Sequence, residues 1–185
     1  MKNYDSYKVK LVAFERCHVP KTVEWVNDAE MIKLIDRSSE PVTIEGCYKW
    51  CDNILEDKTK KMFAITTGDS GVHIGNCGLF EIDNRSRKAK LWIYIGDKEM
   101  WHKGLGREAL EQLIAYGFEN LDLNKIYLYV VEDNERAQKL YKSAGFSKEG
   151  VFRKDTFLEG RFKDAVYYGL LKNEFNKRKN HDQAK

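Results

Sequence analysis

The order of apolar and polar residues predicts the elements in the first third of the chain. Apolar side chains alternate with more polar ones over residues 8–14, which is typical of a strand. Apolar residues then recur at helical spacing over 23–34 and again over 48–55. Pro20 suits a first helical turn, and Pro41 separates the two stretches. We therefore expect one strand followed by two helices.

The middle of the chain predicts three strands joined by tight turns. Strand-like runs cover residues 62–67, 72–82 and 89–95. The segments between them, 68–71 and 83–86, are rich in the Gly, Asp, Asn and Ser residues that hairpin turns favour. Because tight hairpin turns join antiparallel neighbours, we expect an antiparallel meander.

A helix, a strand and a second helix are predicted next. An amphipathic run covers 105–121, and an apolar strand covers 126–131. Asp133 is the candidate N-cap of the following helix, because its carboxylate can accept from backbone N–H groups. Gly145 suits the position just after the end of that helix, where a left-handed conformation is common.

These elements predict one α/β domain over residues 1–175. Two last strands, over about 146–157 and 162–171, complete a mixed, mostly antiparallel sheet of six or seven strands with about four flanking helices. Residues 176–185 are polar, and we expect them to fray. The sequence shows no repeat, linker or low-complexity segment that would indicate a second domain.

The composition narrows the classes of function. The 32 basic and 29 acidic residues give a net charge of +3, too small to indicate nucleic-acid binding. No apolar run approaches the ~20 residues that cross a bilayer, and the N-terminus has no apolar signal-peptide core. We expect a cytoplasmic protein with neither a nucleic-acid nor a membrane partner.

The four cysteines do not indicate a metal site. Cys17, Cys47, Cys51 and Cys77 lack a second Cys or His pair at zinc-ligand spacing. A disulfide framework in a chain of this size would carry more cysteines. We expect four free thiols in a reducing compartment and no bound metal.

The stretch from Trp101 to Glu108 is the first candidate binding site. It joins a predicted strand to a predicted helix and contains Gly104 and Gly106. The first N–H groups of a helix lack intrahelical partners and lie at the positive end of its dipole, so they can hold a phosphate. The alternative is a tight turn without a ligand. The expected backbone donors are those of His102, Lys103, Gly104, Leu105, Gly106 and Arg107, with added charge from Lys103 or Arg107.

A second motif follows one strand later. Residues 134–146 read NERAQKLYKSAGF and match the pattern N-x-x-A-x-x-x-Y-x-x-x-G-F at each fixed position. With the glycine turn, this motif resembles the GCN5-related N-acetyltransferase (GNAT) superfamily over about residues 8–175. Residues 25–28 and 160–164 resemble the branch that acetylates ribosomal-protein N-termini, polyamines and nucleotide-linked amino sugars. One departure is Trp101, where the family turn often has Arg or Gln.

The resemblance implies a fold and a set of roles. Two central parallel strands, near 92–95 and 126–131, are expected to splay and admit the pantetheine arm of acetyl-CoA. A backbone N–H near Ile93 or Tyr94 would then stabilise the oxyanion. Tyr141 would act as the acid for the leaving thiolate, although the residue pattern alone also allows a packing role. The resemblance assigns the acyl arm and its surroundings to Ile93, Tyr94, Ile95, Asn134 and Arg136.

The general base is the least constrained role. Glu81 is the first candidate because it lies at the end of a predicted central strand near the expected acceptor cleft. Glu99 and His73 are alternatives, and ordered water could carry the proton without a dedicated base. The helices over residues 20–58 are expected to form the variable wall of the acceptor site.

The function implied is acetyl-CoA-dependent N-acetylation by direct attack of a primary amine. A basic cluster on the last hairpin would suit a nucleotide-linked amino sugar as acceptor, although a solvated hairpin edge protected by charge is the better explanation of that cluster. A ribosomal-protein N-terminus, aided by residues 177–179, and a polyamine, which would need an acidic cleft, are alternatives. A non-catalytic acyl-CoA sensor also stays open, as does a homodimer. The cluster comprises Arg153, Lys154, Arg161 and Lys163.

Overall fold

The computed structural model describes residues 8–35 and 40–183. Seven strands form one sheet in the order β1-β2-β3-β4-β5-β7-β6, and every neighbouring pair is antiparallel except β4 and β5. This is the predicted mixed α/β sheet, and the predicted meander is β2-β3-β4. The strands are β1 (Val9–Ala13), β2 (Lys61–Thr67), β3 (His73–Asp83), β4 (Lys88–Ile95), β5 (Lys125–Val131), β6 (Ser147–Leu158) and β7 (Arg161–Leu171).

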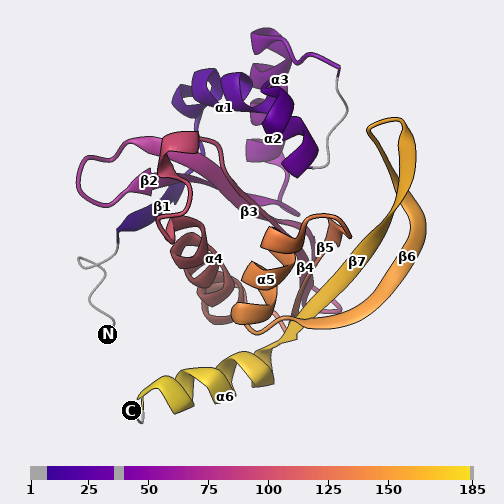
Figure 1. Cartoon of the computed structure of the whole chain (residues 1–185). Helices are drawn as coiled ribbons and strands as arrows, with labels where there is room; N and C mark the ends of the chain where they lie inside the picture. Colours follow the sequence, from indigo (N-terminus) through magenta and orange to yellow (C-terminus); the bar gives the residue numbers. More distant parts are fainter. Residues whose placement is uncertain (1–7, 36–39, 184–185) are drawn as a thin grey trace.

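Six α-helices lie within the described residues, two more than the four expected. Helices α1, α2 and α3 gather on one side of the sheet, and α4 and α5 lie on the other (Figure 1). Short 3-10 turns cover Arg16–His18 and Lys98–Met100, and a π-helical turn at Tyr116–Asn120 extends α4. The helices are α1 (Val19–Val26), α2 (Ala29–Leu34), α3 (Ile44–Glu56), α4 (Leu105–Ala115), α5 (Glu135–Ser143) and α6 (Lys172–Gln183).

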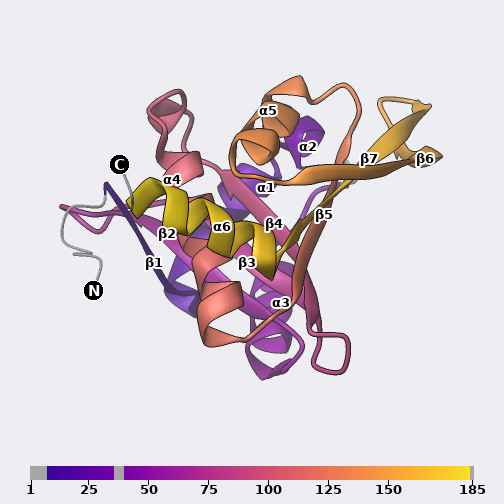
Figure 2. The ribbon, with the colours of Figure 1, turned by 90° about the horizontal axis from the view of Figure 1, so that it is seen from below.

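The extra helices have identifiable causes. Helix α2 is separate from α1 because the Asp28 side chain accepts from the N–H groups of Glu30 and Met31 and so starts a new helix. Residues 176–183 of the polar tail that we expected to fray belong to α6, and residues 184–185 lie outside the described residues. In α6, the Arg178 side chain donates to the Ser143 carbonyl at 2.9 Å, and Lys179 pairs with Glu119 at 2.6 Å. Figure 2 shows α6 on the underside of the molecule, beyond the end of β7.

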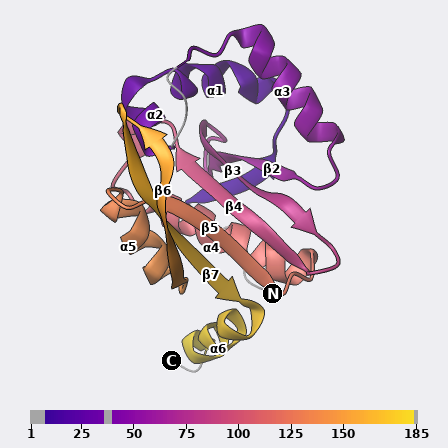
Figure 3. The ribbon, with the colours of Figure 1, turned by 90° about the vertical axis from the view of Figure 1, so that its right-hand side faces the viewer.

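The main core lies between the sheet and helices α4 and α5. Alternate residues of β5, Ile126 and Leu128, point into this core, whereas Tyr127 and Tyr129 lie on the opposite face. A second cluster, which includes Phe14 and Cys51, lies under α1 and α3 on that opposite face. Figure 3 shows α1 to α3 over the β1 to β4 half of the sheet, with β7 and β6 continuing it beyond β5. This layering leaves the junction between β4 and β5 as the place where the two halves meet.

Candidate active site

The turn before α4 has the geometry of an anion site. Gly104 is the N-cap of α4 and has φ of 79°, a left-handed conformation that favours glycine. The Gly104 carbonyl accepts from the N–H groups of Arg107 and Glu108, at 3.1 and 3.2 Å. The N–H groups of Leu105 and Gly106 have no carbonyl partner within the helix. Of the six expected backbone donors, that of Arg107 is therefore already engaged within the protein.

Trp101 has a structural role that explains its departure from the family pattern. Its indole N–H donates to the Ile95 carbonyl at 2.8 Å, which ties the turn to the end of β4. The Arg136 guanidinium lies 5.2 Å from the Trp101 ring centroid, within the range of a cation–π contact. The indole thus holds both the turn and a cationic side chain in place.

Strands β4 and β5 separate as the resemblance implies. They pair only over Lys88–Lys90 and Lys125–Tyr127, although β4 continues to Ile95 and β5 to Val131. Beyond these three pairs, no ladder joins the two strands in the described chain. The parallel pair is therefore closed at one end and open at the other.

The pairing with β3 fixes which backbone groups face the gap. The Gly96 N–H donates to the Ile74 carbonyl at 2.9 Å, so this residue of the β4 extension points toward β3. Backbone groups of an antiparallel strand alternate in direction. The N–H and carbonyl groups of Leu91, Ile93 and Ile95 therefore point away from β3, into the gap. Of the two oxyanion donors expected from the sequence, this alternation favours Ile93 over Tyr94.

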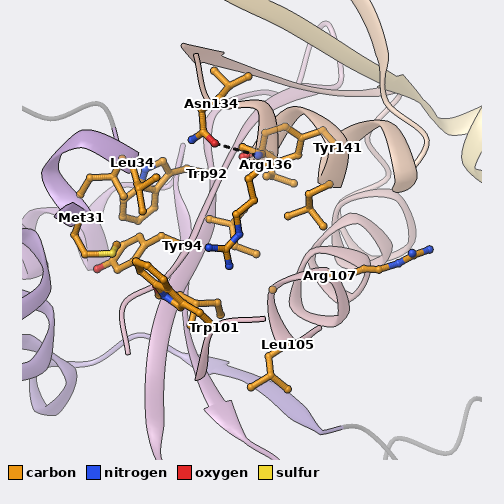
Figure 4. Close-up of a pocket in the computed structure, with 18 of the residues that line it drawn as sticks. Met31, Leu34, Trp92, Tyr94, Trp101, Leu105, Arg107, Asn134, Arg136 and Tyr141 are labelled. Atoms are coloured by element: carbon orange, nitrogen blue, oxygen red, sulfur yellow. Dashed lines mark hydrogen bonds between the residues drawn. The ribbon is translucent and has the colours of Figure 1, made fainter. Parts of the chain in front are cut away.

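A cavity of about 600 Å³ occupies the gap. Figure 4 shows Arg136 and Tyr141 on one side of it and Met31, Leu34, Trp92 and Tyr94 on the other. Most of the expected cofactor residues line it, and Lys103 does not. The expected residues in the lining are Ile93, Tyr94, Ile95, His102, Gly104, Leu105, Gly106, Arg107, Asn134, Arg136 and Tyr141.

Tyr141 is buried at the α5 side of the cavity, with 8% of its surface exposed. Its ring packs against Phe146 and Tyr168, with centroid separations of 6.0 and 6.4 Å. Burial disfavours the charged phenolate and raises the pKa of Tyr141 to about 12. The hydroxyl is therefore a hydrogen-bond donor at every physiological pH.

Asn134, not Asp133, caps helix α5. The Asn134 side-chain oxygen accepts from the Ala137 N–H at 3.0 Å, drawn as a dashed line in Figure 4. The Asp133 carboxylate instead pairs with Arg161 at 3.2 Å and with Lys163 at 3.0 Å. Because Asn134 also lines the cavity, capping and ligand contact are compatible roles for one side chain.

Glu81 does not lie in the cavity. It is in an irregular segment of β3, accepts from the Tyr127 hydroxyl at 2.7 Å and lies 3.5 Å from the Lys90 ammonium. Its side chain is 60% exposed, beside the closed end of the β4–β5 pair. The alternatives Glu99 and His73 are also absent from the described lining. The structure therefore does not bring the expected base to the other site residues.

The α2 side of the cavity was only coarsely anticipated from the sequence. Met31, Leu34 and Ile35 from α2 and its C-cap line it, and they fall within the residues 20–58 that we expected to form the acceptor wall. Lys33 and Lys90 also line this side, and the described lining contains no carboxylate. No sequence pattern singled out the two lysines, because their common location depends on how α2 packs beside β4.

The basic cluster on the last hairpin is not part of the described lining. Lys163 pairs with Asp133 and Glu159, each at 3.0 Å, and Arg161 pairs with Asp133. The neighbouring carboxylates raise the pKa of Lys163 through hydrogen bonds and charge. Two of the four cluster charges are thus neutralised locally, which weakens the case for an anionic acceptor at this hairpin.

Two further findings bear on the expected partners. Within the described ranges, no group of three or more His, Cys, Asp or Glu side chains is arranged so that it could hold a metal ion. Among the same residues, no helix has both the length and the apolar character that crossing a membrane requires.

Comparison with known proteins identifies relatives of this site and fold. A family model described as an acetyltransferase (GNAT) domain matches residues 8–147. The chain is 36% identical over 124 residues to an uncharacterized N-acetyltransferase p20 of Bacillus licheniformis, covering 67% of this chain and 68% of the relative. It is 31% identical over 124 residues to a spermidine N(1)-acetyltransferase of Escherichia coli (strain K12), covering 67% of this chain and 65% of that enzyme.

Solved structures extend the similarity to nearly the whole chain. A spermidine N-acetyltransferase from Vibrio cholerae, in complex with CoA and spermine, superposes with a TM-score of 0.86 at 25% identity. The match covers 91% of this chain and 98% of that one. A dodecameric structure of spermidine N-acetyltransferase from the same organism gives a TM-score of 0.80 at 26% identity, covering 92% of this chain and 98% of the other.

Proposed function

We propose that this chain, which belongs to the acetyltransferase (GNAT) family and uses acetyl-CoA as its co-substrate, acetylates a primary amine of a small molecule by direct attack. The observation that carries the proposal is one cavity joining three features. These are the glycine turn at Gly104, the unpaired edge of β4 at Ile93 and the buried hydroxyl-bearing residue Tyr141. They match the three tasks of holding the cofactor, stabilising the oxyanion and assisting the leaving thiolate.

The cofactor is proposed to lie along the open edge of β4. Its pyrophosphate faces the N–H groups at the start of α4, with Arg136 held nearby over Trp101. Its extended arm pairs with the backbone of Leu91 and Ile93, as a further strand would. The thioester carbonyl then lies within reach of the Ile93 N–H, which donates to the developing oxyanion.

The proton balance follows from acidities. The amine nitrogen attacks the thioester carbon, the C–S bond breaks, and the thiolate leaves. A thiol has a pKa of about 8.5, well below the pKa of about 12 for Tyr141. Full proton transfer from Tyr141 to the thiolate is therefore uphill. Tyr141 is proposed to donate a hydrogen bond to the sulfur, while the proton comes from the nitrogen that has just become cationic.

The acceptor class is the finer part of the proposal. Relatives whose names include spermidine support a polyamine over the nucleotide-linked amino sugar that the sequence favoured. The lysines on this side of the lining do not exclude a charged acceptor, because Lys33 pairs with Glu159 at 2.9 Å and Lys90 lies 3.5 Å from Glu81.

A transfer assay with the purified full-length chain tests the proposal. Release of CoA thiol from acetyl-CoA is measured with spermidine, putrescine, simple alkylamines, a nucleotide-linked amino sugar and a basic N-terminal peptide. We expect amine-dependent thiol release and an acetylated product with at least one small amine. Binding of acetyl-CoA without thiol release for any amine would contradict the proposal and support the sensor alternative.

A further inference from the structure

A second cavity of about 600 Å³ lies between helices α1 and α3 and the β4 strand. It is separate from the turn and from Tyr141, and nothing in the family match assigns it a ligand. Its walls come from the inner face of α1, the segment before α3 and the first turns of α3. They include Thr22, Val26, Val42, Cys47 and Trp50.

This second cavity adjoins the acceptor side of the first one. Ile35 and Trp92 line both cavities, so a ligand that passes these two side chains extends from one into the other. The Trp92 ring packs edge-on against Phe80 and Tyr94, with centroids 6.0 and 4.9 Å apart. Because Trp92 is held between two neighbours, the shared wall is a fixed feature of the sheet.

The chemistry of the second cavity differs from that of the first. Its described lining contains no Lys, Arg, Asp, Glu or His side chain. The Thr22 hydroxyl already donates to the His18 carbonyl and accepts from Asn76, at 2.9 and 3.0 Å. The Thr43 hydroxyl accepts from the Gly46 N–H at 3.0 Å. A charged group placed here would lose its hydration without a counter-charge, so the site suits an uncharged apolar group.

The outer wall of this cavity is tied in place. The Asn27 side chain donates to the Val42 carbonyl and accepts from the Val42 N–H, both at 2.8 Å. This pair of hydrogen bonds joins the C-terminal end of α1 to the segment that precedes α3. The cavity therefore exists before a ligand arrives, which lowers the ordering cost of binding.

We propose that the second cavity binds an apolar alkyl or aryl tail carried by the acceptor amine. This inference rests on the proposed function, because the amine must attack the thioester in the first cavity while its tail passes Trp92. The substrate class is then a primary amine on a hydrocarbon tail, in contrast to a polyamine whose distal ammonium groups would be buried beside Trp50 and Val26.

A chain-length series tests the inference. The ratio kcat/KM is measured with ethylamine, butylamine, hexylamine, octylamine and 2-phenylethylamine, all of which present an aliphatic primary amine, and with spermidine. Burial of each methylene group is expected to raise kcat/KM by about fourfold until the cavity is filled. A flat or falling series, with spermidine the best acceptor, would overturn the inference while leaving amine acetylation in place.

A matched pair of variants locates the effect. Val42→Trp fills the second cavity and is expected to abolish the preference for octylamine over ethylamine. Ile44→Trp adds the same ring two residues away, at a position that is 40% exposed and outside the lining, and is expected to keep that preference. An unchanged preference in Val42→Trp, shown by calorimetry to bind acetyl-CoA normally, would overturn the inference.

A second measurement does not depend on a folded variant. Straight-chain alcohols carry the tail without the amine, so they should inhibit competitively with the amine and more strongly as the chain lengthens. Loss of this trend would overturn the inference. If no amine supported thiol release, the proposed function would fail, and direct binding of 1-octanol by calorimetry would still decide whether the second cavity takes an apolar ligand.

Discussion

Tyr141 illustrates how one side chain obtains its role from its surroundings. The ring lies among apolar neighbours, and the burial that raises its pKa also keeps its proton in place. A hydroxyl with this acidity cannot serve as a strong acid toward a thiolate, yet it can donate to one throughout the physiological range. The proposed contribution is therefore a hydrogen bond that strengthens as charge develops on sulfur.

Replacing Tyr141 with Phe should lower kcat with little effect on acetyl-CoA binding. A lost charge-assisted hydrogen bond of about 3 kcal/mol corresponds to about a 100-fold decrease in kcat. Steady-state kinetics and calorimetric titration with acetyl-CoA measure the two quantities. Tyr116→Phe is the matched control, because it removes a hydroxyl from a residue outside the cavity lining. An unchanged kcat in Tyr141→Phe would contradict the role.

The pH profile should follow the acceptor amine. Only the neutral amine attacks, so kcat/KM should rise about tenfold per pH unit up to an amine pKa of about 10. No described carboxylate lines the cavity to accept that proton at lower pH. Because the pKa of Tyr141 is raised to about 12, its hydroxyl stays protonated. We therefore expect no decrease in kcat/KM with rising pH until the pH exceeds about 11.

The Glu81→Gln variant separates this profile from one set by a carboxylate base. Glu81 lies outside the lining, so the variant should keep both the wild-type profile and a kcat within about twofold of wild type. A kcat decrease of 100-fold or more, which removal of a general base produces, would restore Glu81 as the base.

These two residues also show what the sequence could predict. The location of Tyr141 could be predicted because the residue belongs to a motif with fixed spacing, and that spacing sets one face of α5. The location of Glu81 relative to the cavity could not be predicted, because it depends on which end of the β4–β5 pair opens. Alternation predicts the face that a strand residue occupies, yet it does not reveal where two distant strands part.

At the scale of elements, the start of α4 holds the most demanding backbone geometry of the site. Gly104 adopts its left-handed conformation in open space, since no atom outside the local backbone lies within 4 Å of the point that a Cβ would occupy there. Glycine is thus required by backbone conformation and not by crowding. The expected consequence is that a side chain at this position shifts the turn and moves the N–H donors that face the cofactor.

Gly104→Ala should therefore destabilise the fold and weaken acetyl-CoA binding. The left-handed conformation costs a non-glycine residue about 1 kcal/mol, or about 2 to 4 °C in Tm for a chain of this size. We expect acetyl-CoA affinity to fall about tenfold, measured by calorimetry. Gly71→Ala is the control, since Gly71 has φ of 67° in open space within the β2–β3 hairpin and does not line the cavity. It should show the same Tm loss with unchanged affinity, and equal affinity in both variants would contradict the anion-site role.

Most elements followed from periodicity and turn residues, and the exceptions have local causes. The break between α1 and α2 is signalled by Asp28, whose capping side chain outweighs the continuing apolar spacing. The cap of α5 moved from Asp133 to Asn134 because Asp133 is drawn into ion pairs with Arg161 and Lys163 from β7. Local patterns cannot foresee a partner that lies some thirty residues away.

At the scale of the whole molecule, the two faces of the sheet are covered differently. One continuous core, which runs from Val9 in β1 to Leu170 in β7, joins both halves of the sheet on the side of α4 and α5. The opposite face carries α1 to α3 over the first half alone, which leaves Tyr129 and Tyr167 stacked beside the cavity on the second half. Helix α6 was not foreseen because its own sequence is polar and its docking depends on α5 and the end of α4.

The three-residue pairing of β4 with β5 has a consequence for the mechanics of the molecule. Two half-sheets meet at a seam that is hydrogen-bonded at one end only. We therefore expect strands β1 to β4 and β5 to β7 to move relative to each other at the open end when no cofactor is bound. An acetyl-CoA arm bound in the seam would hold the two half-sheets together for as long as it stays bound. At 100 times its Kd, such a ligand adds about 2.7 kcal/mol of stability. Backbone hydrogen exchange should then slow at Ile93 and in residues 128–131 when acetyl-CoA is bound. Uniform slowing across the chain would contradict binding of the arm in this seam. Each catalytic cycle would stiffen the sheet when the cofactor enters and loosen it when CoA departs.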